Sequence, residues 1–161
     1  MHIVRSILGV FVAAVVAIIL IMIGHMVNTL INLPAGLNLM DQDAIMAHYK
    51  EHGPTTPMLI GVLVTYAVAA FVAGFLAALI AGWAPRGHAL VVGVLLTCAG
   101  LANLLTVPFT HPVWFWTVNL AEFVLAALLG SLLVRGQRRA VESHPPPAAA
   151  QGGRLFEEDT R

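Results

Sequence analysis

Long apolar segments separated by short polar connections dominate the pattern of this chain. No Asp, Glu, Lys or Arg occurs between Arg5 and Asp41, and none occurs between Glu51 and Arg86. The same holds from Arg86 to Glu122. Because about 20 apolar residues suffice for a helix to cross a bilayer, the pattern predicts four membrane-spanning helices. Their expected ranges are 7–31, 57–83, 89–107 and 113–134.

The connection between the first two spans is long enough to hold a helix of its own. Asp41 can cap the start of this helix by accepting backbone N–H bonds, and the Gly-Pro pair at 53–54 would end it. Its apolar residues recur on one face at helical spacing: Ile45, Met46 and Tyr49. We therefore predict a short outer amphipathic helix within 38–52. It either lies along the membrane surface or covers the bundle as a lid with an apolar underside, and we favour the lid.

The two other connections are tight turns. The Ala-Pro-Arg-Gly segment at 84–87 and the segment 109–112 are too short for anything else, so consecutive spans are antiparallel neighbours. The expected fold is an all-α, up-down four-helix bundle over residues 1–134. Small residues recur every four positions in the second span: Ala70, Gly74, Ala78 and Gly82. Such a stripe lets helix backbones approach closely, either within one chain or between the chains of a homo-oligomer.

Composition and charge place this bundle in a membrane and orient it. Hydrophobic residues make up 59% of the chain and charged residues 10%, against roughly 25% charged in a soluble domain. Basic residues gather at the N-terminal tip, the 84–87 turn and the tail: Arg5, Arg86, Arg135, Arg138, Arg139, Arg154 and Arg161. Basic residues near span ends stay on the cytoplasmic side. We therefore expect both termini in the cytoplasm, and a multi-pass protein of the bacterial inner membrane.

The remaining composition narrows the partners. Residues 135–161 are rich in Arg, Pro and Gly and carry too few apolar side chains to fold, which predicts a disordered cytoplasmic tail. A net charge of zero provides no basic footprint for nucleic acid. Cys98 is the only cysteine, so an intramolecular disulfide is excluded. The expected partners are the lipid bilayer, other membrane proteins or a second copy of this chain.

Five polar residues within the predicted spans project to similar depths: His25, Asn28, Asn103, Asn119 and Glu122. Glu122 is the only formally charged residue inside a span, and such a residue should face the bundle interior and have a partner. Apolar surroundings disfavour the charged carboxyl, so we expect Glu122 to donate a hydrogen bond to Asn28, Asn103 or His25, or to form an ion pair with His25. This intramembrane cluster is either a structural clasp between helices or a site that binds a ligand or responds to protons.

A second group of candidates lies in the outer connections: Asp41, Asp43, His48, His52 and His111. The string from His48 to His52 matches the H-x-x-E-H pattern of one zinc-peptidase class. Two histidines four apart on a helix can share a metal ion. However, the Gly-Pro pair at 53–54 ends the helix at once, and no third ligand is evident. We therefore predict no catalytic residue and no cofactor, and leave the metal open.

Three features of the sequence are similar to those of a known family. They are the outer loop with Asp41 and Asp43, the small-residue stripe after Ala70 and the segment from His111 to Trp116. Together they resemble a family of small four-span bacterial inner-membrane proteins, over about residues 5–134. The His-Pro-x-Trp-Phe turn before the last span is the most specific of these motifs. This resemblance implies a four-span bundle in the bacterial inner membrane. It implies no activity, because none is assigned to the family. Thr110 and His25 depart from its pattern, which has Pro before the turn histidine and an acid near position 25.

The leading functional hypothesis from the sequence is a small, non-enzymatic accessory or interaction subunit in the membrane. Small-residue stripes and the lack of catalytic motifs support it. The alternative is a small proton-coupled transporter or ligand-binding membrane protein that uses Glu122. An enzyme or metal protein built on His25, His48, His52 and His111 is the third and weakest hypothesis.

Overall fold

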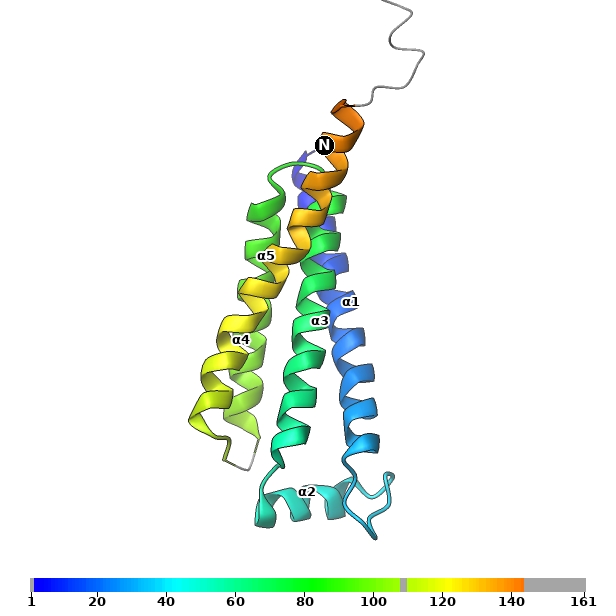
Figure 1. Cartoon of the computed structure of the whole chain (residues 1–161), viewed down its shortest axis with the longest axis vertical. Helices are drawn as coiled ribbons and strands as arrows, with labels where there is room; N and C mark the ends of the chain where they lie inside the picture. Colours follow the sequence, from blue (N-terminus) through cyan, green and yellow to red (C-terminus); the bar gives the residue numbers. More distant parts are fainter. Residues whose placement is uncertain (1, 108–109, 144–161) are drawn as a thin grey trace, which may run out of the picture.

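The computed structural model describes residues 2–107 and 110–143, with side chains described as far as Val134. Within these residues the chain forms helices and no strand. The helices are α1 (His2–Ile31), α2 (Gln42–His52), α3 (Thr56–Ala81), α4 (Pro85–Thr106) and α5 (Val113–Ser143). The four long helices run up and down as a bundle, and α2 lies across one end (Figure 1). The predicted all-α four-helix fold is confirmed.

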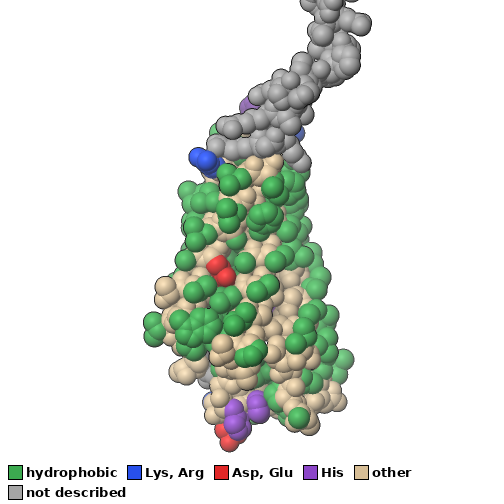
Figure 2. Space-filling view, in the orientation of Figure 1, with side chains coloured by type: hydrophobic (Ala, Val, Ile, Leu, Met, Phe, Trp, Pro, Cys, Tyr) green, Lys and Arg blue, Asp and Glu red, His purple; other side chains and the backbone are tan. Residues whose placement is uncertain are grey.

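The bundle has its apolar surface on the outside. All four long helices are long and apolar enough to cross a membrane. Large apolar side chains cover their outer faces (Figure 2), among them Ile7, Val64, Leu105 and Leu125. A monomeric soluble protein rarely exposes a continuous apolar surface of this extent. The chain is therefore a multi-pass membrane protein. The N-terminus and the last residues of α5 lie at one end of the bundle, which we call the terminal end. Helix α2 lies at the opposite end (Figure 1).

Small residues let the helices pack closely inside the bundle. Ala13 and Ala17 of α1 and Ala70 of α3 have no exposed surface. A Cβ atom at Gly74 would overlap the backbone of α5, and one at Gly130 would overlap the backbone of α3. The stripes therefore serve contacts within one chain. The sequence had left open whether they join two helices of one chain or two copies, and the structure assigns them to internal packing.

The turn between α3 and α4 lies earlier than the sequence indicated. Gly82 follows α3 with a φ of 75°, in the left-handed region that favours glycine. Ala84 caps α4 with a φ of 42°, and Pro85 is the first residue of that helix. The predicted tight connection is present, and the Gly87 N–H donates to the Ala84 carbonyl at 3.0 Å. Residues 85–87 nevertheless already belong to α4, because proline, which lacks a backbone N–H, fits well in the first turn of a helix. Helix α4 thus begins four residues before the expected span.

The short helix α2 is capped as predicted. The Oδ1 atom of Asp41 accepts a hydrogen bond from the Ala44 N–H at 3.0 Å, and Gly53 ends the helix with a φ of 74°. Ile45 and Tyr49 are buried against the bundle, and the Tyr49 hydroxyl donates to the Asn32 carbonyl at 3.3 Å. The amphipathic helix is therefore a lid with its apolar face on the bundle, and Met46, although 44% exposed, also faces the space beneath it.

The last helix continues beyond the predicted end of the bundle. The sequence placed a disordered tail at 135–161, but α5 runs on to Ser143. Arg, Gln and Ala, which fill most of residues 135–140, are strong helix formers and extend a helix already begun in the membrane. That part of the prediction was wrong. The rest of the predicted tail, residues 144–161, lies outside the described residues.

Candidate functional site

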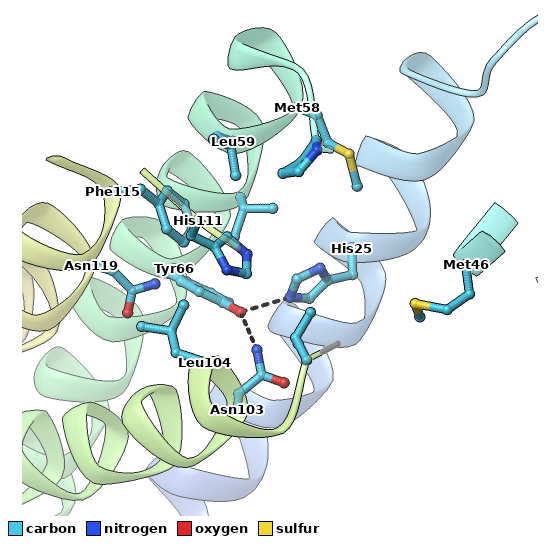
Figure 3. Close-up of a pocket in the computed structure, with 13 residues that line it drawn as sticks. His25, Met46, Met58, Leu59, Tyr66, Asn103, Leu104, His111, Phe115 and Asn119 are labelled. Atoms are coloured by element: carbon cyan, nitrogen blue, oxygen red, sulfur yellow. Dashed lines mark hydrogen bonds between the residues drawn. The ribbon is translucent and has the colours of Figure 1, made fainter. Parts of the chain in front are cut away.

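A cavity of about 200 Å³ lies inside the bundle beneath α2. All four long helices and the α4–α5 connection contribute to its wall, and each supplies one polar side chain (Figure 3). These side chains are His25, Tyr66, Asn103, His111 and Asn119. Apolar side chains such as Leu59, Val62 and Phe115 complete the wall. Four of the polar residues were sequence candidates, and the structure brings them together around a fifth, Tyr66.

Tyr66 is the centre of the polar network. Its hydroxyl lies 3.0 Å from Nε2 of His25 and receives a long hydrogen bond, 3.5 Å, from the Asn103 side-chain amide. A tyrosine hydroxyl has one proton to donate, so a consistent arrangement has it donating to Nε2 of His25 and accepting from Asn103. Its ring packs against Phe123 with centroids 5.1 Å apart. These contacts hold one polar side chain from each of α1, α3 and α4 in a hydrogen-bonded group at the cavity wall.

Asn119 is the unusual residue of the cavity. It is only 1% exposed, yet neither its side-chain oxygen nor its side-chain nitrogen has a hydrogen-bond partner among the described residues. Figure 3 shows its amide turned toward the cavity, on the side of Tyr66 and His111. Buried polar atoms are almost always hydrogen-bonded to protein or water. A donor and an acceptor are therefore available at this wall for a molecule inside the cavity.

His111 closes the cavity from the α4–α5 connection. Its ring stacks on Phe115 with centroids 5.0 Å apart and an interplanar angle of 14°. Partial burial lowers the pKa of His111 from its ordinary value of 6.5, because desolvation disfavours the charged ring. At neutral pH this wall of the cavity therefore presents a neutral, flat, aromatic surface.

Glu122 does not line this cavity. Among the described residues it makes none of the hydrogen bonds predicted for it, and one buried oxygen, Oε1, has no partner there. It is half-buried and near enough to Tyr66 to act on it electrostatically. Glu122 is the only acidic residue of the four candidate spans, and it lies near the middle of the span Val113–Val134. Three positions along a helix differ by about 60° in direction, so Asn119 faces the cavity while Glu122 faces its edge.

Asn28 takes a structural role away from the cavity. Its side-chain nitrogen donates to the Met58 carbonyl of α3 at 3.0 Å, and its side-chain oxygen accepts from Asn32 at 2.9 Å. Gly61 leaves room for this contact, since a Cβ there would overlap the Asn28 amide. The clasp interpretation therefore describes Asn28, which joins α1 to α3 and makes no wall of the cavity.

The outer candidates do not form one site. His48 and His52 stack with ring centroids 4.5 Å apart, and His52 bonds the His48 carbonyl through Nδ1 at 3.2 Å. Asp41 is engaged as a helix cap, and Asp43 is exposed in the first turn of α2. Within the described part of the chain, no three His, Cys, Asp or Glu side chains are placed to hold a metal ion. His111 belongs to the cavity beneath α2.

Sequence reasoning missed Tyr66, although a signal was present. It is the one tyrosine inside a predicted span, and its hydroxyl needs a partner at membrane depth.

In comparisons with protein-family models, curated proteins and solved structures, nothing matches this chain. The resemblance to a family of small four-span bacterial proteins therefore stays a prediction, and the function must be argued from the cavity itself.

Proposed function

We propose that this chain is a non-enzymatic, multi-pass protein of the bacterial inner membrane that binds a small neutral polar molecule in the cavity beneath α2. The observation that carries the proposal is Asn119, a fully buried amide whose donor and acceptor atoms are unsatisfied by the described residues and turned toward a cavity. Leaving such groups empty costs about 1–3 kcal/mol each. A bound molecule that accepts from and donates to this amide removes that cost.

The size and chemistry of the cavity define the class of molecule. A cavity of about 150 Å³ can hold benzene, so the present 200 Å³ suits a molecule of about one ring with polar substituents. No Asp, Glu, Lys or Arg occurs among the residues that line it. A charged ligand would have no counter-charge at this depth, and its desolvation would be unfavourable. A neutral ligand fits these walls better.

The orientation proposed from the sequence agrees with the arrangement of the chain ends. Both the N-terminus and the end of α5 lie at the terminal end (Figure 1), and Arg5 and Arg86 are carried by helix segments at that end. Basic residues at this end favour its placement in the cytoplasm. The cavity and α2 would then lie on the outer side of the membrane.

This binding role has better structural support than the other functions considered. A transporter that uses Glu122 would need that carboxyl on the pathway, whereas the cavity is lined without it. The interaction-subunit hypothesis rested partly on small-residue stripes, and these stripes face the inside of the bundle. A partner protein remains compatible with ligand binding, but the described contacts supply no surface that requires one.

The test compares two substitutions of the same kind on α3. Val62 lines the cavity and is 8% exposed, whereas Val64 is 57% exposed on the outer face. We expect the natural chain and Val64→Phe, purified in mild detergent and denatured, to release the same small molecule at about one per chain. Val62→Phe should release far less, because the added ring occupies the cavity. Mass spectrometry of the extract gives the amounts, and circular dichroism confirms that each variant folds.

Equal release from the natural chain and a folded Val62→Phe variant would contradict the proposal. If Val62→Phe does not fold, Asn119→Leu replaces it, since this change removes the hydrogen-bonding groups and keeps the size of the side chain. Retention of the same molecule by Asn119→Leu would then be the contradicting result.

A further inference from the structure

A second hollow lies beside the cavity, on the side of α1 and α4. It has a volume of about 280 Å³ and shares His25, Tyr66 and Asn103 with the cavity beneath α2. From these polar residues it continues between Ile18 of α1 and Leu96 of α4. Helix α1 packs mainly on α3 and only lightly on α4. The second hollow therefore lies on a lightly packed side of the bundle, and the hydrogen-bonded side chains of His25, Tyr66 and Asn103 form the wall that it shares with the cavity.

An apolar groove extends this hollow toward the terminal end. It measures about 520 Å³ and lies between Val10 and Ala14 of α1 and Val91 and Leu95 of α4. Ala14 and Ile18 are one helical turn apart, so the groove begins where the second hollow ends. The line from the cavity to the groove thus changes from polar to apolar along the length of the bundle.

The α2 end of the bundle is covered. Helix α2 lies across it (Figure 1), its residues Ile45 and Tyr49 are buried there, and the Tyr49 hydroxyl bonds the end of α1 at Asn32. A molecule from water would have to displace this lid. For a molecule dissolved in the bilayer, the alternative route is the lightly packed side between α1 and α4, across the wall of His25, Tyr66 and Asn103 that the two hollows share.

We propose that the bound molecule belongs to the quinone class, with a neutral planar ring in the cavity beneath α2 and an apolar tail along α1 and α4. This inference rests on the proposed function and specifies its ligand. The ring follows from the flat stacked pair of His111 and Phe115 and from the absence of charged side chains in the lining. Quinone carbonyl oxygens are hydrogen-bond acceptors, and the Asn119 amide and the Asn103 amide are donors at the wall (Figure 3).

The position proposed for the tail follows from the order of the three spaces along α1 and α4, from the cavity past the neighbouring hollow to the apolar groove. Each methylene removed from water and laid on an apolar wall contributes favourably, but a tail already in lipid gains little from an apolar surface alone. The groove therefore guides the tail, whereas the hydrogen bonds of the ring decide which lipid-soluble molecules bind. A phospholipid is disfavoured, because its charged phosphate would meet no basic residue among those that line the cavity.

The experiment uses the full chain in nanodiscs of a neutral synthetic phospholipid, with two quinones as probes. Duroquinone is a tail-less ring, and decylplastoquinone carries a similar ring with an apolar tail. Quinones quench tryptophan fluorescence, and Trp116 packs against the core near the cavity. Quenching is measured against quinone per lipid, with empty nanodiscs and free tryptophan as the background.

Two variants on α4 separate the ring from the tail. Ala99 lines the second hollow, and Ala102 is also exposed but lines none of the described hollows. We expect Ala99→Phe to weaken the binding of decylplastoquinone by about tenfold, equal to about 1.4 kcal/mol. The binding of duroquinone should change little. Ala102→Phe should leave both unchanged, and Val62→Phe should abolish both.

The outcomes separate this inference from the proposed function. Saturable quenching by neither quinone would overturn the quinone assignment, while release of another neutral molecule by the natural chain would leave the proposed function standing. Binding of both quinones with no effect of Ala99→Phe would overturn the path of the tail. If the extraction test fails as well, the cavity holds no ligand and both proposals fall.

Discussion

Replacing Asn119 by leucine tests whether the cavity is built for binding or is only a gap in packing. Asn119 is 1% exposed, and both polar atoms of its side chain lack a partner among the described residues. In the empty protein these atoms are a cost, because water in a small, mostly apolar cavity satisfies them only in part. Leucine has a similar size and no polar atom. Asn119→Leu should therefore stabilise the empty protein while it removes binding.

The expected size of the effect follows from the unsatisfied atoms. Each buried unsatisfied group costs about 1–3 kcal/mol when fully dry. The two polar atoms of Asn119 would together cost about 2–6 kcal/mol in a dry cavity. Partial hydration reduces this cost, so we expect a gain of about 1–3 kcal/mol in the free energy of unfolding. Ligand raises the stability of the natural chain by mass action, so the comparison requires ligand-free protein, refolded from a fully denatured and extracted sample.

Asn28→Leu is the matched control. Asn28 is also buried, but its amide bonds the Met58 carbonyl and Asn32. The same substitution there breaks a bond between α1 and α3 and should lower the free energy of unfolding by about 1 kcal/mol, within the range measured for such bonds in membrane proteins. Reversible unfolding in mixed micelles, followed by tryptophan fluorescence, gives both values. If Asn119→Leu destabilises the empty protein as much as Asn28→Leu does, the reasoning about the unsatisfied amide is wrong.

Three further changes test other parts of the structure. Gly130→Ala should lower the free energy of unfolding by about 1–3 kcal/mol, because its Cβ would overlap the backbone of α3, whereas the open Gly87→Ala should cost nothing in the same assay. Burial lowers the pKa of His111, so the folded state binds fewer protons than the unfolded state below about pH 6.5. Unfolding free energy should therefore be full above that pH and fall on acidification, and His111→Phe should flatten the fall; an unchanged slope would contradict this. A lipid-soluble carbodiimide should label Glu122, whereas a water-soluble one should label Asp43. Peptide mass spectrometry of the natural chain identifies the labelled residues, and Glu122→Gln is the control. Labelling of Glu122 by the water-soluble reagent alone would refute its placement near the middle of the span.

The spans could be predicted from the sequence because lipid contact is recorded in the length of each apolar run. The rotation of each helix about its axis could not. Lipid and the bundle interior are both apolar, so the outward-facing Ile18 and the buried Ala17 of α1 look alike in a hydrophobic pattern. Depth estimates correctly grouped His25, Asn103 and Asn119, whereas Asn28, nearly one turn beyond His25, forms a different contact.

Rotation also explains why Glu122 does not line the cavity and why Tyr66 was overlooked. A charge in a span draws attention because its insertion is costly, but Glu122 is only half-buried and lies outside the lining of the cavity. The hydroxyl of Tyr66 carries no formal charge and hides in an apolar run. Its role becomes visible only when α1 and α4 place His25 and Asn103 against it.

The cavity follows from how α3 and α5 cross. At Gly74 and Gly130 the two backbones are so close that neither position has space for a Cβ atom. Toward the α2 end the helices diverge (Figure 1), and the rings of Tyr66, Phe115 and Phe123 lie between them. A rigid close crossing on one side forces separation on the other, because α-helices bend little over a few turns. The rings fill only part of the space thus opened, and the polar atoms of Asn119 and Tyr66 face the remainder. The glycines near the terminal end therefore help to set the size of the site beneath α2, and a change at Gly130 should alter ligand binding as well as stability.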